Sequence, residues 1–226
     1  KIIYYLKRYI RQVVNKLIFK LFLPLIGDFV AKECQNIERI RQIISLLETV
    51  DYVNKHLYNV QSFGNKYELI KYAISHIIND NIGIICEFGV GSGTTINFIA
   101  DLIPDRIVYG FDSFEGLPED WRDGFPKGTF RQLDIPQVKS NVKLINGLFS
   151  ETLPTFMKEA SETVAFIHVD CDLYSSTKTI LDNLKPYIKS NTVIVFDEFL
   201  TIQGGKRGNI KLLLNLLLTQ EKRCVL

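Results

Sequence analysis

Apolar residues recur along positions 2–25 with the period of an α-helix, and the basic residues lie mostly on the opposite face. Charged residues interrupt every stretch of about 20 residues, the length that a membrane-spanning helix needs. Lys16 and Lys20 also break the apolar run that a signal peptide requires. The pattern therefore predicts an amphipathic helix at the surface, followed by a second helix over Asn36–Val50.

A polar, Asn-rich linker runs from this region to Gly64, and short apolar runs then alternate with helical patterns. The first helix beyond the linker is predicted over Tyr67–Ile78. Buried strands are predicted at Gly83–Phe88, Ile107–Phe111, Val142–Ile145, Val164–Val169 and Thr192–Phe196. Strands alternating with helices indicate a doubly wound α/β fold, with a mostly parallel sheet covered on both faces. We expect a helical extension at residues 1–60 and the α/β domain at residues 61–226.

Charge is distributed unevenly along the 226 residues, although the net charge is only +2. Residues 1–27 contain six basic side chains and no acidic one, whereas the remainder contains 21 basic and 25 acidic side chains. An acidic domain is a poor candidate for binding nucleic acid. The four cysteines have no paired spacing, which favours reduced thiols in a reducing, cytoplasmic compartment. Three histidines make a His-rich zinc site improbable.

Ligands of open α/β sheets bind at the carboxyl ends of the strands, so the chemistry is expected there. The first strand ends in Glu87-Phe88-Gly89-Val90-Gly91-Ser92-Gly93, and a helix follows. Glycines allow the backbone to turn sharply against a ligand, and the helix N-terminus offers unpaired N–H groups. The G-x-G-x-G spacing differs from the G-x-G-x-x-G fingerprint of dinucleotide-binding proteins.

The next two strand ends also carry candidate binding residues. Asp112 follows the second strand, where a carboxylate can accept both hydroxyls of a ribose. The third strand leads into Asn146-Gly147-Leu148-Phe149, where a backbone N–H and an aromatic face suit an adenine ring.

The last two predicted strands end in acidic residues. Asp170 follows the fourth strand, and Asp197 and Glu198 follow the fifth. Three carboxylates in one cleft repel each other, so a divalent cation is a natural partner, and all-oxygen ligands suit Mg²⁺, Mn²⁺ or Ca²⁺. The alternative is that one or two of these acids cap helices while a lysine or arginine neutralises the rest.

Five separated motifs together resemble the class I S-adenosylmethionine-dependent methyltransferases, and most closely the macrocin O-methyltransferase-like family. The motifs are Glu87-Phe-Gly-Val-Gly-Ser-Gly93, Tyr109-Gly-Phe-Asp-Ser-Phe-Glu-Gly-Leu-Pro118, Glu151-Thr-Leu-Pro154, Asp170-Cys-Asp-Leu-Tyr-Ser-Ser-Thr177 and Phe196-Asp-Glu-Phe199. Many members of that family methylate sugar hydroxyls with a bound Mg²⁺. The resemblance covers about Gln61 to Phe199.

The resemblance implies a role for each strand end. The residues expected to contact S-adenosylmethionine are Glu87, Phe88, Gly89, Gly91, Gly93, Asp112, Ser113, Phe114, Gly147 and Phe149. Asp170, Asp197 and Glu198 correspond to the family's metal ligands, although the family often has Asp where Glu198 stands. The implied reaction is direct transfer of the sulfonium methyl to a hydroxyl of a small molecule or sugar. Asp170 is the expected proton acceptor.

Two other functions stay open. Tyr174-Ser-Ser-Thr-Lys178 matches the Y-x-x-x-K pair of short-chain reductases, with Ser161 upstream, but Ser161 precedes its strand. The plainer interpretation is that Asp172 or Ser175 caps a helix and that Lys178 lies on its surface. The second alternative is a non-catalytic protein with a methyltransferase fold, located at a membrane surface or in an assembly. The segment over residues 117–130, with Trp121, is expected either to form a loop over the acceptor site or to be an ordinary surface loop.

Two expectations concern the ends of the chain. A helical run at Gly208–Leu218 is followed only by Arg223-Cys-Val-Leu226, so the C-terminal edge of the sheet is expected to be short. The apolar face of residues 1–27 requires a partner, because an isolated helix is marginally stable in water. That partner is expected to be a second copy of the chain, the chain's own domain, or an anionic membrane surface.

Overall fold

A computed structural model describes residues 59–77, 82–122 and 124–197, together with positions 37, 40, 43, 44, 47, 50 and 53–55. The chain divides into two units, of which the second begins at Asn59 and contains every element named below. Each described position between 37 and 55 is helical, which agrees with the helix expected over Asn36–Val50. The helices expected at residues 2–25 and 208–218 lie outside the described residues, and the domain boundary at residue 60 stays a prediction.

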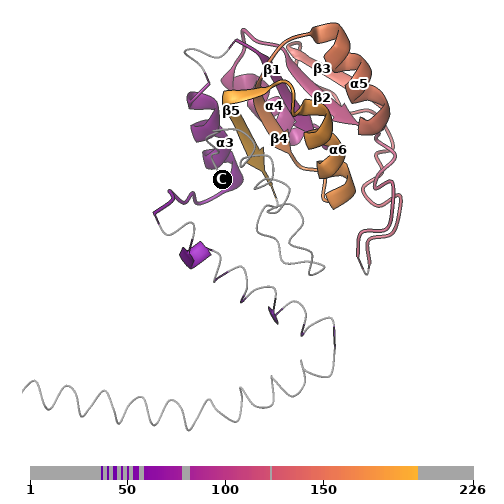
Figure 1. Cartoon of the computed structure of the whole chain (residues 1–226). Coiled ribbons are helices and arrows are strands. Elements are labelled where there is room, and N and C mark those ends of the chain that lie inside the picture. Colours follow the sequence, from indigo (N-terminus) through magenta and orange to yellow (C-terminus); the bar gives the residue numbers. More distant parts are fainter. Residues whose placement is uncertain are drawn as a thin grey trace, which may run out of the picture. The chain divides into compact units, whose positions relative to one another are not determined.

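In residues 59–197, as far as they are described, five parallel strands form the sheet of the second unit, in the order β3-β2-β1-β4-β5 (Figure 1). The strands are β1 Ile84–Phe88, β2 Val108–Asp112, β3 Val142–Asn146, β4 Val164–Val169 and β5 Ile188–Phe196. All five predicted strands are therefore confirmed. β5 begins earlier than its apolar run because exposed polar residues, among them Lys189 and Ser190, occupy its first half.

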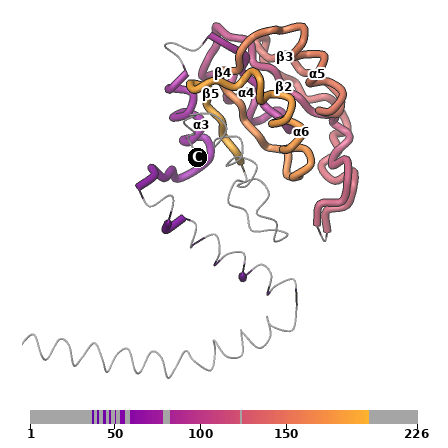
Figure 2. Tube along the Cα trace, viewed as in Figure 1, coloured from indigo at the N-terminus to yellow at the C-terminus, as the bar shows by residue number. Residues whose placement is uncertain are grey.

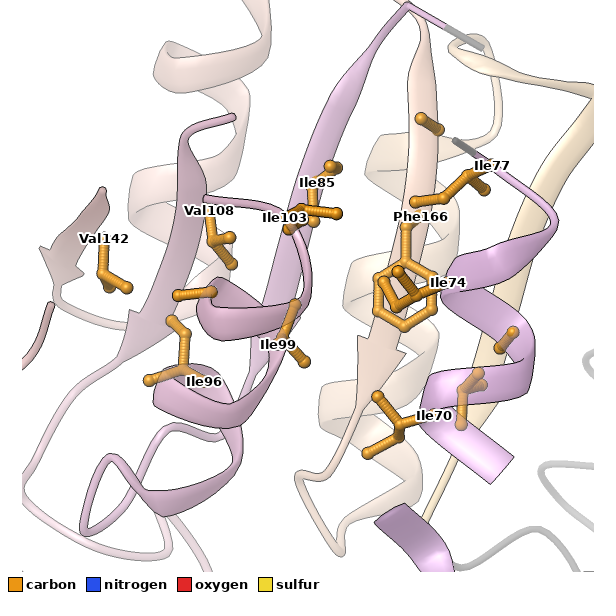
Figure 3. Close-up of a cluster of buried hydrophobic side chains, with 14 of the residues drawn as sticks. Ile70, Ile74, Ile77, Ile85, Ile96, Ile99, Ile103, Val108, Val142 and Phe166 are labelled. Carbon is orange, nitrogen blue, oxygen red and sulfur yellow. The ribbon is translucent and has the colours of Figure 1, made fainter. Parts of the chain in front are cut away.

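Within the described part of the chain, four helices cover the two faces of this sheet. They are α3 Lys66–Ser75, α4 Thr94–Leu102, α5 Phe149–Ala160 and α6 Tyr174–Leu184. One buried cluster joins α3 and α4 to the sheet through residues such as Ile74, Ile99 and Phe166 (Figure 3). A second cluster joins α5 and α6 to the opposite face through Leu153 and Ile180. The doubly wound fold class is confirmed, because helices pack on both faces of a parallel sheet.

The start of α3 is fixed by a capping box. The side chain of Asn65 accepts a hydrogen bond from the backbone N–H of Glu68, and the Glu68 carboxylate accepts from the N–H of Gly64. The bond from the Glu68 N–H satisfies a donor that the first helical turn leaves unpaired, and the bond from Gly64, one residue before the N-cap, makes this a variant of the capping box. The backbone of Lys66, the first residue of α3, is therefore held in place beside the sheet.

The long connection between β2 and β3 contains no helix in its described part, and it extends beyond the sheet (Figure 2). The guanidinium of Arg122 lies over two aromatic rings of this connection that contact each other, 3.9 Å from the ring centre of Trp121 and 4.3 Å from that of Phe125. The hydroxyl of Ser175, in the first turn of α6, donates a hydrogen bond to Glu119. These contacts hold the connection near the carboxyl end of β4.

Candidate active site

The loop after β1 contains three glycines with positive φ, which are Gly89, Gly91 and Gly93 at 92°, 51° and 81°. A Cβ on Gly89 would lie 1.8 Å from the backbone oxygen of Asp170, so only glycine fits there. A Cβ on Gly91 would meet nothing within 4 Å, so its backbone faces open space. The loop is therefore packed against the protein at Gly89 and open to a ligand at Gly91. Gly93 is the N-cap of α4 and directs that helix's first N–H groups toward the same loop.

Asp112, at the end of β2, holds the glycine loop in place. Its two carboxylate oxygens accept hydrogen bonds of 2.8 Å from the backbone N–H groups of Gly91 and Phe114. Each carboxylate oxygen has further lone pairs with which to accept a hydroxyl. From the sequence we expected this carboxylate to bind a ribose, and it lies beside the open part of the loop.

The remaining residues expected to contact a nucleoside lie nearby but differ in exposure. Gly147 donates its backbone N–H to the backbone oxygen of Asp112, which aligns the end of β3 with that of β2. Ser113 accepts a hydrogen bond from the N–H of Glu115. Phe114 is buried, and the ring of Phe149 packs edge-on against that of Phe88, with ring centres 5.4 Å apart.

Glu87 and Phe88 were expected to contact the cofactor, but both side chains are fully buried in the sheet. The Phe88 ring stacks on that of Phe111. Glu87 pairs across the sheet with His168 of β4, and 2.9 Å separates Glu87 Oε1 from His168 Nδ1. Glu87 Oε2 and His168 Nε2 have no hydrogen-bond partner among the described residues. Burial raises the pKa of Glu87, against the opposing effect of His168.

The ends of β4 and β5 bring Asp170 and Asp197 together, as the sequence predicted. The backbone N–H of Asp170 donates to Phe88, and that of Asp197 donates to Val169, so each residue continues the hydrogen bonding of its strand. The ammonium of Lys66 lies 3.7 Å from Asp170 Oδ2 and 3.4 Å from Asp197 Oδ1. The third expected ligand, Glu198, lies outside the described residues.

The charges of this cluster shift the pKa values of its members. Burial raises the pKa of Asp170, and the neighbouring Asp197 raises it further, against the smaller effects of His168 and Lys66. Burial lowers the pKa of Lys66, but the two carboxylates outweigh it, so this pKa lies above its ordinary value. Lys66 is therefore a charged counter-ion of both carboxylates.

The donor chemistry of Asp170 and Asp197 fits a hard divalent cation, because both offer carboxylate oxygens to one point in space. At that point, however, the structure places the Lys66 ammonium. Glu87, His168 and Asp170 also offer ligand atoms within 4.8 Å of one another, a set that the sequence analysis did not identify.

The reductase pattern is not assembled into a site. Ser161 ends α5 and precedes β4, whereas Tyr174 and Lys178 lie on the exposed side of α6, where Lys178 pairs with Asp182. The expected helix caps were wrong, because the N-cap of α6 is Leu173, without a side-chain hydrogen bond. Ser175 instead contacts Glu119, and Asp172 has positive φ.

Sequence reasoning missed Lys66 and His168. His168 interrupts an apolar run at the position that pairs with Glu87, so two ionisable residues in adjacent buried strands were the available signal. Lys66 carried no such signal, because only the packing of α3 beside β5 brings its side chain to the strand ends.

A sequence family described as a methyltransferase domain matches residues 86–199. The curated relatives include demethyldecarbamoylnovobiocin O-methyltransferase from Streptomyces niveus, 26% identical over 60% of each chain. The 8-demethyl-8-(2,3-dimethoxy-alpha-L-rhamnosyl)-tetracenomycin-C 4'-O-methyltransferase from Streptomyces olivaceus is 26% identical over 58% of each chain. The present chain thus spans about 60% of the length of these relatives.

Two solved structures share the fold. Calicheamicin methyltransferase CalS11 superposes with a TM-score of 0.56 and 21% identity, covering 80% of this chain and 85% of CalS11. The O-methyltransferase NovP superposes with a TM-score of 0.51 and 24% identity, covering 68% of this chain and 71% of NovP. Because the family match spans half of the chain and includes both the glycine loop and the acidic strand ends, the chain belongs to the methyltransferase domain family and has the class I methyltransferase fold.

Proposed function

We propose that this chain transfers a methyl group from S-adenosylmethionine to a hydroxyl group of a small molecule or sugar, assisted by a divalent cation. One observation carries the proposal. The open glycine loop with Asp112 and the acidic pair of Asp170 and Asp197 lie at the same edge of one sheet, and Gly89 packs directly against Asp170. A nucleoside bound at the loop would therefore lie next to the carboxylates.

The residues of the loop fit the proposed cofactor. The backbone at Gly91 faces open space, and the carboxylate of Asp112 is fixed beside it by two backbone N–H groups. The N-terminus of α4 stabilises a carboxylate such as that of the methionine moiety. Glu87 and Phe88 support the loop from within the core, and we propose that only their backbone faces the cofactor.

S-adenosylmethionine, when bound, supplies an electrophilic methyl group on its sulfonium. The acceptor oxygen forms the new bond to the methyl carbon as the bond from carbon to sulfur breaks, and the hydroxyl proton goes to a base. Asp170 is the proposed base, because it packs against the glycine loop, and in the metal-free site burial and Asp197 raise its pKa above that of an ordinary aspartate. Asp170, Asp197 and Glu198 would hold a divalent cation, which lowers the pKa of an acceptor hydroxyl.

A sugar hydroxyl is the proposed acceptor class. One of the relatives is named for a rhamnosyl compound that it methylates at a 4' oxygen, and both are named O-methyltransferases. The connection between β2 and β3, with its Trp121 and Arg122, lies near the end of β4 through the contact from Glu119 to Ser175, which supports its contact with an acceptor.

Calorimetry on the full chain tests the cofactor assignment. We expect S-adenosylhomocysteine to bind and NAD to give no heat. Binding of NAD without binding of S-adenosylhomocysteine would reject the methyltransferase proposal and restore the reductase alternative. Binding of S-adenosylhomocysteine without turnover on any sugar acceptor leaves the non-catalytic alternative in place.

The sequence of residues 1–27 predicts a helix with an apolar face that requires a partner, and these residues lie outside the described part of the chain. Among the described residues, no helix has the length and apolar character of a membrane span. We propose that this segment pairs with a second copy or packs on its own domain, with anionic membrane binding as the alternative. Flotation with anionic liposomes at low and high salt, with and without residues 1–27, distinguishes these partners, because six basic residues make membrane binding salt-sensitive.

A further inference from the structure

The ammonium of Lys66 lies where the two acidic strand ends converge. Its Nζ atom is 3.4 Å from Asp197 Oδ1 and 3.7 Å from Asp170 Oδ2. We propose that Lys66 is the resident cation of this site, and that a divalent ion binds Asp170 and Asp197 only by displacing its side chain. This inference rests on the metal site of the proposed function.

Two cations do not fit between these carboxylates together. A divalent ion bonds carboxylate oxygens at about 2.0–2.6 Å. An ion bonded to Asp170 Oδ2 and Asp197 Oδ1 would therefore take the two oxygens that Nζ now faces, and the two positive charges would repel each other. Occupation by metal and occupation by the ammonium are mutually exclusive.

The side chain of Lys66 is able to leave, although its backbone is fixed. The capping box of Asn65 and Glu68 holds the first turn of α3. The Lys66 side chain is 41% exposed, against 25% for Asp170 and 24% for Asp197. A lysine has a flexible four-carbon stem and a strongly hydrated ammonium, so the head group can turn into water while the helix stays in place.

The charge balance of the site favours a doubly charged occupant. One ammonium faces two carboxylates. A divalent ion would neutralise the pair that a single ammonium leaves with net negative charge. Lys66 thus keeps the metal-free site ordered and raises the metal concentration needed to fill it.

Mn²⁺ binding to the full chain, measured by loss of the free-ion electron paramagnetic resonance signal, tests this competition. The variants are Lys66→Met and Lys66→Gln, which remove the ammonium, and Lys71→Met as a matched control. Lys71 belongs to the same helix, and its side chain is exposed. We expect both Lys66 variants to bind Mn²⁺ at least tenfold more tightly than the unaltered chain, and Lys71→Met to bind as the unaltered chain does. Asp197→Asn added to Lys66→Met should abolish the gain.

Thermal unfolding and S-adenosylhomocysteine calorimetry on the same samples identify which idea fails. Unchanged or weaker Mn²⁺ binding in a folded Lys66 variant overturns the displacement proposal. Failure of every variant to bind Mn²⁺, with cofactor binding intact, overturns both the metal site and the role of Lys66 but leaves the methyltransferase assignment standing. Tighter Mn²⁺ binding without cofactor binding supports Lys66 displacement and contradicts the methyltransferase assignment.

Discussion

Gly89 and Asp170 are in such close contact that a Cβ on Gly89 would lie 1.8 Å from the Asp170 backbone oxygen. The contact joins the turn after β1 to the end of β4. Because the neighbouring atom is backbone rather than a flexible side chain, neither residue can move aside without distorting a strand end.

Gly89→Ala is therefore expected to destabilise the chain. Positive φ in a non-glycine residue costs about 1–3 kcal/mol, and a forced clash adds about 1–3 kcal/mol. Urea unfolding measures the loss. Gly91→Ala is the matched control, because its Cβ enters open space, and it should cost only the backbone strain while weakening binding of S-adenosylhomocysteine. Equal losses of stability in the two variants would contradict the packing argument.

Asp112→Asn is expected to weaken S-adenosylhomocysteine binding by about 1–3 kcal/mol, the magnitude of a hydrogen bond to a charged group. The amide keeps the size of the carboxylate but offers only one oxygen to the N–H groups of Gly91 and Phe114. Calorimetry measures the change. Asp182→Asn, on the exposed surface of α6, serves as the control and should bind normally. Full affinity in Asp112→Asn would exclude this carboxylate from the cofactor site.

Glu87→Gln is expected to change how stability depends on pH. Burial raises the pKa of Glu87 in the folded chain above the value of about 4.3 in the unfolded chain. Between these two values the folded chain binds more protons than the unfolded chain, so this residue makes stability fall as pH rises. The glutamine variant lacks that contribution.

Urea unfolding of both forms from pH 4 to pH 8 measures the difference. The free energy of unfolding of the variant, relative to that of the unaltered chain, should rise with pH and level off above the folded-state pKa. A difference that stays constant over the whole range would show that Glu87 is not perturbed by its burial.

The two described cysteines should resist alkylation in the folded chain. Burial raises the pKa of Cys171 to about 12, and burial also raises the pKa of Cys86. At pH 8, four pH units below a pKa of 12, the reactive thiolate is roughly one part in ten thousand. Peptide mass spectrometry after iodoacetamide treatment, with a urea-unfolded sample as reference, measures the protection. Labelling at the same rate in both samples would contradict it.

The fold was predictable from the sequence because buried parallel strands are nearly continuous apolar runs. The runs ending at Phe88 and Val169 illustrate this, since every residue of these strands is buried. The convergence of Asp170 and Asp197 was equally predictable, because adjacent parallel strands end at the same edge.

The electrostatics of the site were less accessible to sequence reasoning. Lys66 lies on a helix whose position against the sheet no local pattern specifies. The sequence around His168 indicates only an apolar strand, and the role of His168 becomes apparent when its pairing with Glu87 is known. The side-chain cap expected at the start of α6 is absent for a similar reason. Ser175 donates its hydroxyl hydrogen bond to Glu119, a residue distant in sequence, and not to the backbone of the helix.

The order of the strands has a consequence for how such a chain diverges. β1 is central, with the residues proposed to bind the nucleoside at the ends of β2 and β3 and the acidic residues directly after β4 and β5. Side-chain substitutions on β2 and β3 leave the hydrogen bonds among β1, β4 and β5 in place, and substitutions on β4 and β5 leave those among β1, β2 and β3 in place. The proposed acceptor flank can therefore vary independently of the proposed nucleoside flank, except at Gly89 and Asp170, where the two must change together.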